Sequence, residues 1–207
     1  KAPSLFQRYS PLYGTRGLES EKAIGVDAGI DQSLFGGRLT LSATGFSTRL
    51  TNLIDFAYGG CPATQIFGCY MNVGRANLSG VEVAAEASLV EGVLSARASY
   101  MHLNAIDDKT DKRLARRPEH SGFLALTWKP FAGFTIEPSL RLVGERFSST
   151  GETQRLAPYA RLDVTADYRL SKAVSVYVRG ENLTNARYQE VYNYGTAGRS
   201  VYLGLRG

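Results

Sequence analysis

The residues best suited to acid–base chemistry stand together at Glu119-His120-Ser121. A carboxylate, an imidazole and a hydroxyl are the groups of a serine hydrolase, in which histidine takes the proton of the attacking hydroxyl. His120 is one of only 2 histidines, and the sequence identifies neither a further carboxylate that would support it nor an oxyanion site. Phosphate-binding glycine loops and metal-ligand spacings are also missing, because the glycine pairs stand at turns. We therefore expect no enzyme and no cofactor.

The chain has 2 cysteines, Cys61 and Cys69, which fall in one expected loop at residues 59–69. An even number of cysteines so close together predicts a disulfide formed in an oxidising compartment. Two free thiols are the alternative. A metal site would need more ligands than this loop offers.

Composition alone does not separate a soluble β domain from a membrane barrel. The 207 residues are 43% hydrophobic, with a mean hydropathy of -0.18. No apolar run approaches the ~20 residues of a transmembrane helix, but a barrel strand needs only about ten residues of alternating polarity. The net charge of +5 is scattered, and no basic stretch interleaved with aromatic residues indicates nucleic-acid binding. The chain opens at Lys1 without the pattern of a signal peptide.

Alternation of apolar and polar residues with a period of two recurs along the chain and predicts β-strands. The apolar positions are Val81, Val83, Ala85, Ala87 and Leu89; Leu94, Ala96, Ala98 and Tyr100; Phe134, Ile136, Leu140 and Leu142; Leu162, Val164, Ala166 and Tyr168; Val174, Val176 and Val178; and Val201, Leu203 and Leu205. A soluble β-sandwich would show the same alternation. The connections between the strands have to decide between the two.

Short and long connections alternate. The short ones lie at residues 35–37, 90–92, 130–133 and 170–172, and the long ones lie near residues 9–20, 59–71, 105–113, 149–158 and 185–198. An up-and-down membrane barrel with short periplasmic turns and long extracellular loops requires this order, whereas a Greek-key sandwich does not. The expected strands from Arg38 to about Phe56 and from Asn72 to about Leu89 are also long for a globular protein. The sequence predicts an all-β, antiparallel up-and-down transmembrane β-barrel.

Charged residues on the polar face indicate a wide lumen, because a barrel of about eight strands is already filled by side chains. They are Glu82, Glu86, Arg97, Glu137, Arg141, Asp163, Asp167, Arg169, Arg179, Glu181 and Arg206. We interpret them as ion pairs that keep the interior wet. An open sheet of about ten strands would leave edge amides unpaired in hydrocarbon, so these strands must close on themselves or continue into a larger barrel.

Several motifs in order resemble the barrel of the TonB-dependent receptors, over nearly the whole chain. They are Lys1-Ala2-Pro3-Ser4-Leu5-Phe6-Gln7 with Leu18-Glu19-Ser20-Glu21-Lys22, in which Ser20 replaces the usual proline; Asn72-Val73-Gly74-Arg75-Ala76 with Gly80-Val81-Glu82; Arg116-Arg117-Pro118-Glu119-His120; and Glu181-Asn182-Leu183-Thr184-Asn185 with Tyr188. Each motif alone is weak, but the ordered set is specific. The chain departs from the family in ending at Leu205-Arg206-Gly207 without a terminal aromatic residue.

The resemblance implies that residues 1–207 are the C-terminal part of a barrel of about 22 strands, without the plug domain. It implies active uptake across the outer membrane, in which loops capture a scarce nutrient and the TonB complex acts on the plug. Residues 188–199 and 52–55 are most similar to cobalamin (vitamin B12) receptors, and a ferric siderophore or haem is the alternative ligand. Outer-membrane lipid and lipopolysaccharide are the other expected partners, and nucleic acid is not.

Five residues are expected to bind the ligand. Tyr194, Arg116 and Arg117 match positions that face ligand in cobalamin receptors, and Tyr192 and Asn193 are included because they are next to Tyr194. Strand parity would turn Arg117 toward the lumen and Arg116 toward lipid, so that Arg116 would need a bulge or a place above the bilayer. A lipopolysaccharide contact is the alternative role for either arginine.

A complete small barrel acting as an outer-membrane protease or adhesin remains a second hypothesis. The protease would need paired Asp and His residues at the lumen rim. We expect His102 and His120 on different loops without such pairing.

Overall fold

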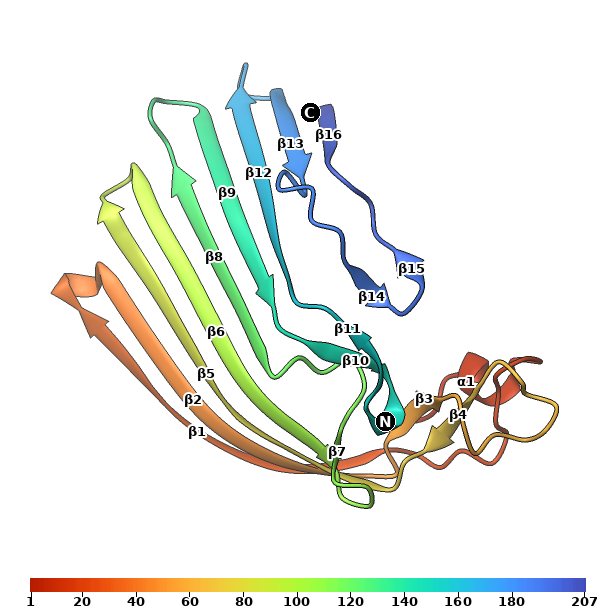
Figure 1. Ribbon diagram of the computed structural model, residues 1–207. Helices are drawn as coiled ribbons and strands as arrows, with labels where there is room; N and C mark the ends of the chain where they lie inside the picture. The colour runs from red at the N-terminus through yellow and green to blue at the C-terminus, as the bar shows by residue number, and fades with distance from the viewer.

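The computed structural model describes residues 1–207 and consists mainly of one curved antiparallel sheet (Figure 1). Its strands follow one another in chain order, with β7 (Lys112–Arg113) added beside β6. The other nine strands are β1 (Lys22–Leu34), β2 (Leu39–Thr51), β5 (Arg75–Val90), β6 (Leu94–Asp107), β8 (His120–Trp128), β9 (Phe134–Val143), β12 (Tyr159–Arg169), β13 (Ser175–Glu181) and β16 (Ser200–Arg206). The predicted all-β antiparallel up-and-down fold is confirmed.

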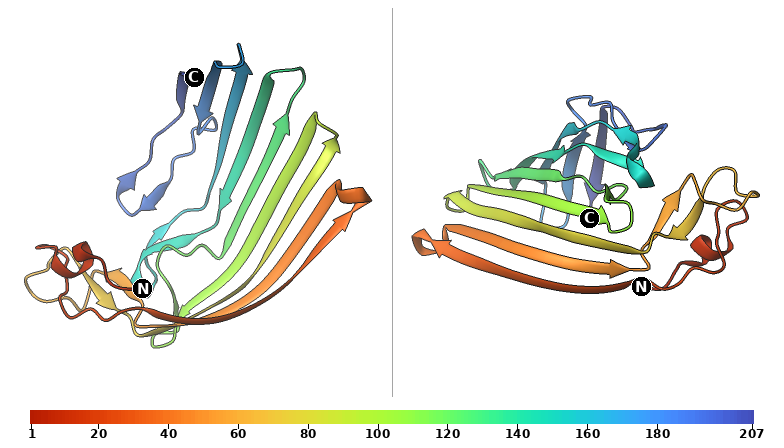
Figure 2. Two further views of the ribbon diagram at one scale, coloured as in Figure 1. Left: turned by 180° about the vertical axis from the view of Figure 1, so that it is seen from behind. Right: turned by 60° about the horizontal axis from the view of Figure 1, so that its bottom comes forward.

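The sheet curves like part of a cylinder wall, and its two edge strands, β1 and β16, do not pair with each other (Figure 2). These strands therefore do not close the barrel. Tight turns gather at one end of the sheet. The first of them needs glycine, because Gly36 and Gly37 have φ values of 67° and 89°, a region that side chains with a Cβ disfavour.

The long connections gather at the opposite end and contain small structures of their own (Figure 1). These are three hairpins, β3 (Ile54–Ala57) with β4 (Cys69–Asn72), β10 (Arg146–Ser149) with β11 (Thr153–Leu156), and β14 (Gln189–Val191) with β15 (Tyr194–Gly195). The helix α1 (Leu5–Tyr9) of the N-terminal segment lies at the same end of the molecule (Figure 1). We call this assembly, together with the ends of the main strands that reach it, the cap. The helices are too short and too polar to span a membrane.

The predicted long strands are interrupted where the sheet enters the cap. Asn52 adopts a left-handed φ of 58° after β2, and Gly74 has a φ of 89° before β5. The Asn52 amide donates to the Gly74 carbonyl at 2.6 Å, so both chains bend together. The expectation of one strand from Arg38 to Phe56 is wrong, because the left-handed residue sends Ile54–Ala57 into a separate hairpin.

The two faces of the sheet have opposite character over most of its length. One face carries exposed apolar side chains, among them Ile30, Leu41, Val83, Leu124, Leu142, Tyr168, Val178 and Leu203. The other face carries the predicted charges, and some of these pair: Arg179 with Glu181 at 3.1 Å and Arg206 with Asp167 at 3.5 Å. Asp163 pairs at 2.7 Å with Arg161, a residue of the same face that the sequence analysis did not single out. Apolar side chains that meet no protein suit lipid, and the charged face suits a wet lumen.

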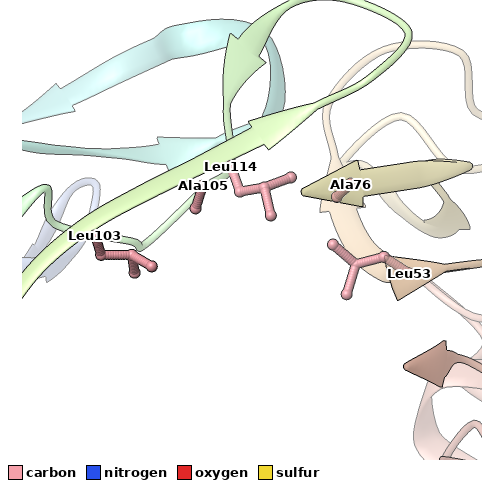
Figure 3. Close-up of a cluster of buried hydrophobic side chains, with 5 residues drawn as sticks. All are labelled: Leu53, Ala76, Leu103, Ala105 and Leu114. Carbon is pink, nitrogen blue, oxygen red and sulfur yellow. The ribbon is translucent and has the colours of Figure 1, made fainter. Parts of the chain in front are cut away.

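This pattern reverses near the cap. On β5, Leu78 and Ala76 lie on the same face as Glu82, while Ser79 and Asn77 lie on the face of Val83. The apolar side chains of this segment form a buried cluster of Leu53, Ala76, Leu103, Ala105 and Leu114 (Figure 3). We call the stretch of the sheet with the exposed apolar face the belt. The strands continue beyond the belt into the cap, where they enclose a water-excluding core on their inner side, as in a soluble protein.

Candidate functional site

Arg116 and Arg117 lie in the turn that leads from β7 to β8, outside any strand. Arg116 has a left-handed φ of 55°. Its amide donates to the Phe147 carbonyl at 2.7 Å, and its Nε donates to the Ser148 carbonyl at 3.2 Å. The assignment of Arg117 to the lumen and Arg116 to lipid by strand parity is wrong, because parity has no meaning in this turn. Both side chains are exposed within the cap.

Tyr192, Asn193 and Tyr194 form the tip of the β14–β15 hairpin. Asn193 has a left-handed φ of 65°, and its amide donates to Gln189 Oε1 at 3.1 Å. The amide of Tyr192 donates to Ser148 Oγ at 3.0 Å. Tyr192 is 39% exposed and Tyr194 is 73% exposed. Ser148 of β10 thus holds Arg116 through its carbonyl and Tyr192 through its hydroxyl, which brings the two predicted segments to one residue.

Sequence reasoning missed Arg146, which positions the β14–β15 hairpin. Its side chain is 2% exposed, and its Nη2 donates to the Gln189 carbonyl and to Glu190 Oε2, each at 2.8 Å. The guanidinium carbon lies 5.4 Å from the ring centroid of Tyr159, which stacks on Tyr188. A buried guanidinium with charge-assisted hydrogen bonds is a strong anchor. Only its tertiary contacts reveal it, because in sequence it is one charged residue at a strand end.

Arg113 of β7 is a second anchor of the cap. It contacts Glu152 at 3.3 Å, and Glu119 and Glu145 at 3.7 Å each. Its guanidinium carbon also lies 4.7 Å from the ring centroid of Phe147. The hydrogen bond from the Arg113 amide, followed by its side chain, holds the pKa of Glu152 below its usual value. This network fixes the turn that carries Arg116 and Arg117.

Asp55 of β3 lies within electrostatic range of both predicted arginines. Burial raises the pKa of its carboxyl, and the Phe56 amide and the charges of Arg116 and Arg117 oppose that rise. The carboxylate accepts from the Phe56 amide at 2.7 Å. The cap therefore combines a positive turn with one half-buried carboxylate.

The structure joins Cys61 and Cys69 in a disulfide across the β3–β4 loop. Beside it, Phe56 packs edge-on against Tyr13, Tyr58 and Tyr70, with ring centroids 5.2–5.7 Å apart. The bond links two residues that are 8 apart in sequence and so closes the loop. An aromatic surface is thereby held in place at the outer end of the molecule.

The motif residue Asn182 has a structural role. It is 3% exposed, its Nδ2 donates to the carbonyls of Ala186 and Ala197, and its Oδ1 accepts from the Ala186 amide. It thus ties both ends of the loop that carries β14 and β15. A groove of about 600 Å³ runs along this loop and β11. None of the five predicted ligand residues lines it.

The two histidines meet, contrary to our expectation that they lie apart on different loops. His102 of β6 stands directly opposite His120, the first residue of β8, and their rings stack with centroids 5.0 Å apart. The pairing register could not be read from the sequence, because an irregular connection separates the strands. Both histidines belong to the row of Val81, which is the apolar face, and not to the lumen rim required for the protease hypothesis.

Three comparisons with known proteins bear on this arrangement. Residues 1–183 match the family described as TonB dependent receptor-like, beta-barrel. The chain is 30% identical over 214 residues to the vitamin B12 transporter BtuB of Vibrio cholerae, covering 99% of this chain and 32% of that protein. It is 28% identical to the BtuB of Photobacterium profundum, covering 98% and 32%. The chain thus spans about a third of the length of the curated relatives it matches.

Solved structures share the fold. The copper transporter OprC superposes with a TM-score of 0.76 at 18% identity, covering 99% of this chain and 35% of that one. A mutant of the ferric enterobactin receptor PfeA from Pseudomonas aeruginosa superposes with a TM-score of 0.73 at 21% identity, covering 99% and 36%.

Proposed function

Because this chain belongs to the family of TonB-dependent receptor β-barrels, we propose that its parent protein takes up cobalamin across the outer membrane. Members of the family are transport receptors in the outer membrane of Gram-negative bacteria, which places these strands there. The chain supplies part of the barrel wall and the loops that capture the ligand. Residues 1–207 form the C-terminal part of the barrel, and the TonB complex acts through a plug contributed by the rest of the parent.

The observation that carries the choice of ligand is the similarity to vitamin B12 transporters, 30% identical over 99% of this chain. The structures of the copper and ferric enterobactin proteins are 18% and 21% identical. At such identities they support the fold alone.

The cap has groups that suit this ligand. Cobalamin carries many amide side chains and one phosphodiester. Arg116 and Arg117 provide donors and positive charge for the phosphate. Tyr192 and Tyr194, both exposed, offer rigid aromatic surface with hydroxyl groups for the amides. Asn193 adds an amide at the hairpin tip. Ser148 holds the two segments together, so they can act on one ligand.

The test is calorimetric titration of the full-length receptor in detergent with cyanocobalamin. We expect Arg117→Ala and Tyr194→Ala each to weaken binding roughly tenfold, about 1.4 kcal/mol, as is typical of Arg and Tyr at the centre of an interface. Arg38→Ala is the matched control, since Arg38 lies at the turn end of the sheet and contacts the Leu89 carbonyl. It should bind cobalamin like the wild type.

A receptor that gives no heat with cyanocobalamin but binds a ferric chelate would overturn the choice of ligand and leave the family intact. Equal binding by the wild type and both cap variants would instead overturn the assigned residues.

A further inference from the structure

The only two histidines of the chain form a compact cluster with one carboxylate at the rim of the apolar face. The Nε2 atom of His120 lies 3.7 Å from Glu119 Oε1, and His102 stacks on His120. One ligand atom from each of the three residues lies within 4.8 Å of the others. Two imidazoles and one carboxylate, with a fourth position open to water, are a known ligand set for zinc.

The side chains around the cluster orient it for a metal ion. Tyr100 places its hydroxyl 2.7 Å from His120 Nδ1. The hydroxyl oxygen can accept from Nδ1–H, and in that tautomer Nε2 keeps its lone pair on the side of Glu119. Outer hydrogen bonds orient metal-binding histidines in this way. The Nδ1 of His102 is buried and has no hydrogen-bond partner. An unpaired buried polar atom is unfavourable, and a metal ion bound at this Nδ1 would give it a partner.

We propose that His102, Glu119 and His120 bind a divalent transition-metal ion of the zinc type at the outer rim of the barrel wall. Donor atoms in a tetrahedral zinc site are about 3.3 Å apart, so these side chains must close by at most about 1.5 Å. His120 is 56% exposed and Glu119 is 44% exposed, which gives the ion and a water access from outside. Glu119 contacts Arg113 at 3.7 Å, a loose pair that the metal replaces.

The site is separate from the proposed ligand site. The row of His102 and His120 lies between the apolar row of Tyr100 and Gly122 and the polar row that contains Asn104. It therefore faces outward, at the level where the apolar belt ends. A bound ion would tie β6 to the start of β8 and so brace the turn that carries Arg116 and Arg117 without touching them. Imidazole ligands favour zinc over calcium and magnesium, which prefer oxygen.

The experiment is a zinc titration of the full-length receptor in detergent against a chromogenic chelator. The wild type is expected to bind one more equivalent of zinc than His102→Ala or His120→Gln, and Glu119→Gln should bind that equivalent at least tenfold more weakly. Glu145→Gln is the matched control, because Glu145 also contacts Arg113 at 3.7 Å but lies outside the cluster. It should retain the full stoichiometry, and excess calcium should not compete.

A second measurement on the wild type removes dependence on the folding of variants. Zinc should protect both His102 and His120 from acylation by diethyl pyrocarbonate, read by mass spectrometry, whereas calcium should not. Equal zinc stoichiometry in the wild type and the histidine variants, or unchanged acylation with zinc present, would overturn the site. Neither result depends on cobalamin, so the proposed function is tested separately.

Discussion

The belt and the cap share strands of the sheet, but the apolar side chains of these strands face outward in the belt and inward in the cap. In the belt, β5 turns Val83 outward and Glu82 inward, whereas in the cap the same strand turns Asn77 outward and Ala76 inward. Ala76 is completely buried, and Val83 is 39% exposed. The alternation of apolar and polar residues along β5 therefore suits lipid outside the belt and water outside the cap, without any change in strand register. The belt is an inside-out protein stabilised by lipid, and the cap is an ordinary protein stabilised by its own core.

The largest effect is expected from emptying the cap core. Leu114 is 3% exposed within the buried cluster, so Leu114→Ala should lower the free energy of unfolding by about 2–5 kcal/mol through lost burial and a cavity. Denaturant unfolding of the full-length receptor measures this. Leu142→Ala on the apolar face of β9 is the control, because lipid chains can fill the space it leaves. An equal loss in both variants would remove the distinction between cap and belt.

A charge added to the outer face should destabilise the belt more than the cap, the opposite order to the leucine substitutions. Ala85 pairs with Leu41 and Ala98 in the middle of the apolar face, and Ala85→Arg should destabilise the barrel in lipid vesicles by about 2–4 kcal/mol. Asn104→Arg places the same charge on the same outer face, at an exposed position of β6 opposite Ser79 where water replaces lipid. Its effect should stay within about 0.5 kcal/mol. Similar values for both arginines would show that the belt extends to Asn104.

The smallest effect is expected from the half-buried carboxyl of the cap. Burial raises the pKa of Asp55 above the ordinary 3.8, so its contribution to stability is present below that value and is lost as pH rises through the folded-state pKa. Asp55→Asn stays neutral and can still accept from the Phe56 amide. The unfolding midpoint of the variant, relative to that of the wild type, should therefore be higher at pH 7 than at pH 3.5. A gain that is the same at both pH values would contradict burial as the cause.

The belt could be predicted from the sequence because one simple rule governs it. Apolar residues at every second position, as at Val81, Val83 and Ala85, predict a lipid-facing strand once the short and long connections alternate. In the structure these residues lie on the exposed apolar face. The same pattern could not reveal the reversal at Leu78. A leucine on the lumen side is explained only by Leu53 and Leu114, which reach it from other segments.

In the cap, sequence motifs singled out individual segments but did not show how they contact one another. The two segments with Arg116 and Tyr192 could be named, but their link through Ser148 depends on a hairpin of only four-residue strands. Such short strands carry too few alternations to be recognised. The Arg146 anchor and the histidine pair were missed for the same reason, since each depends on residues that only the folded register brings together.

The strict chain order of the sheet has a consequence for how the molecule forms. Each main strand pairs only with its neighbours in chain order, β7 beside β6 apart, and four of these pairs are joined by tight turns. Contacts close in sequence require little loop-closure entropy. The sheet can therefore grow one hairpin at a time, and every intermediate presents a single advancing edge as the template for the next pair of strands.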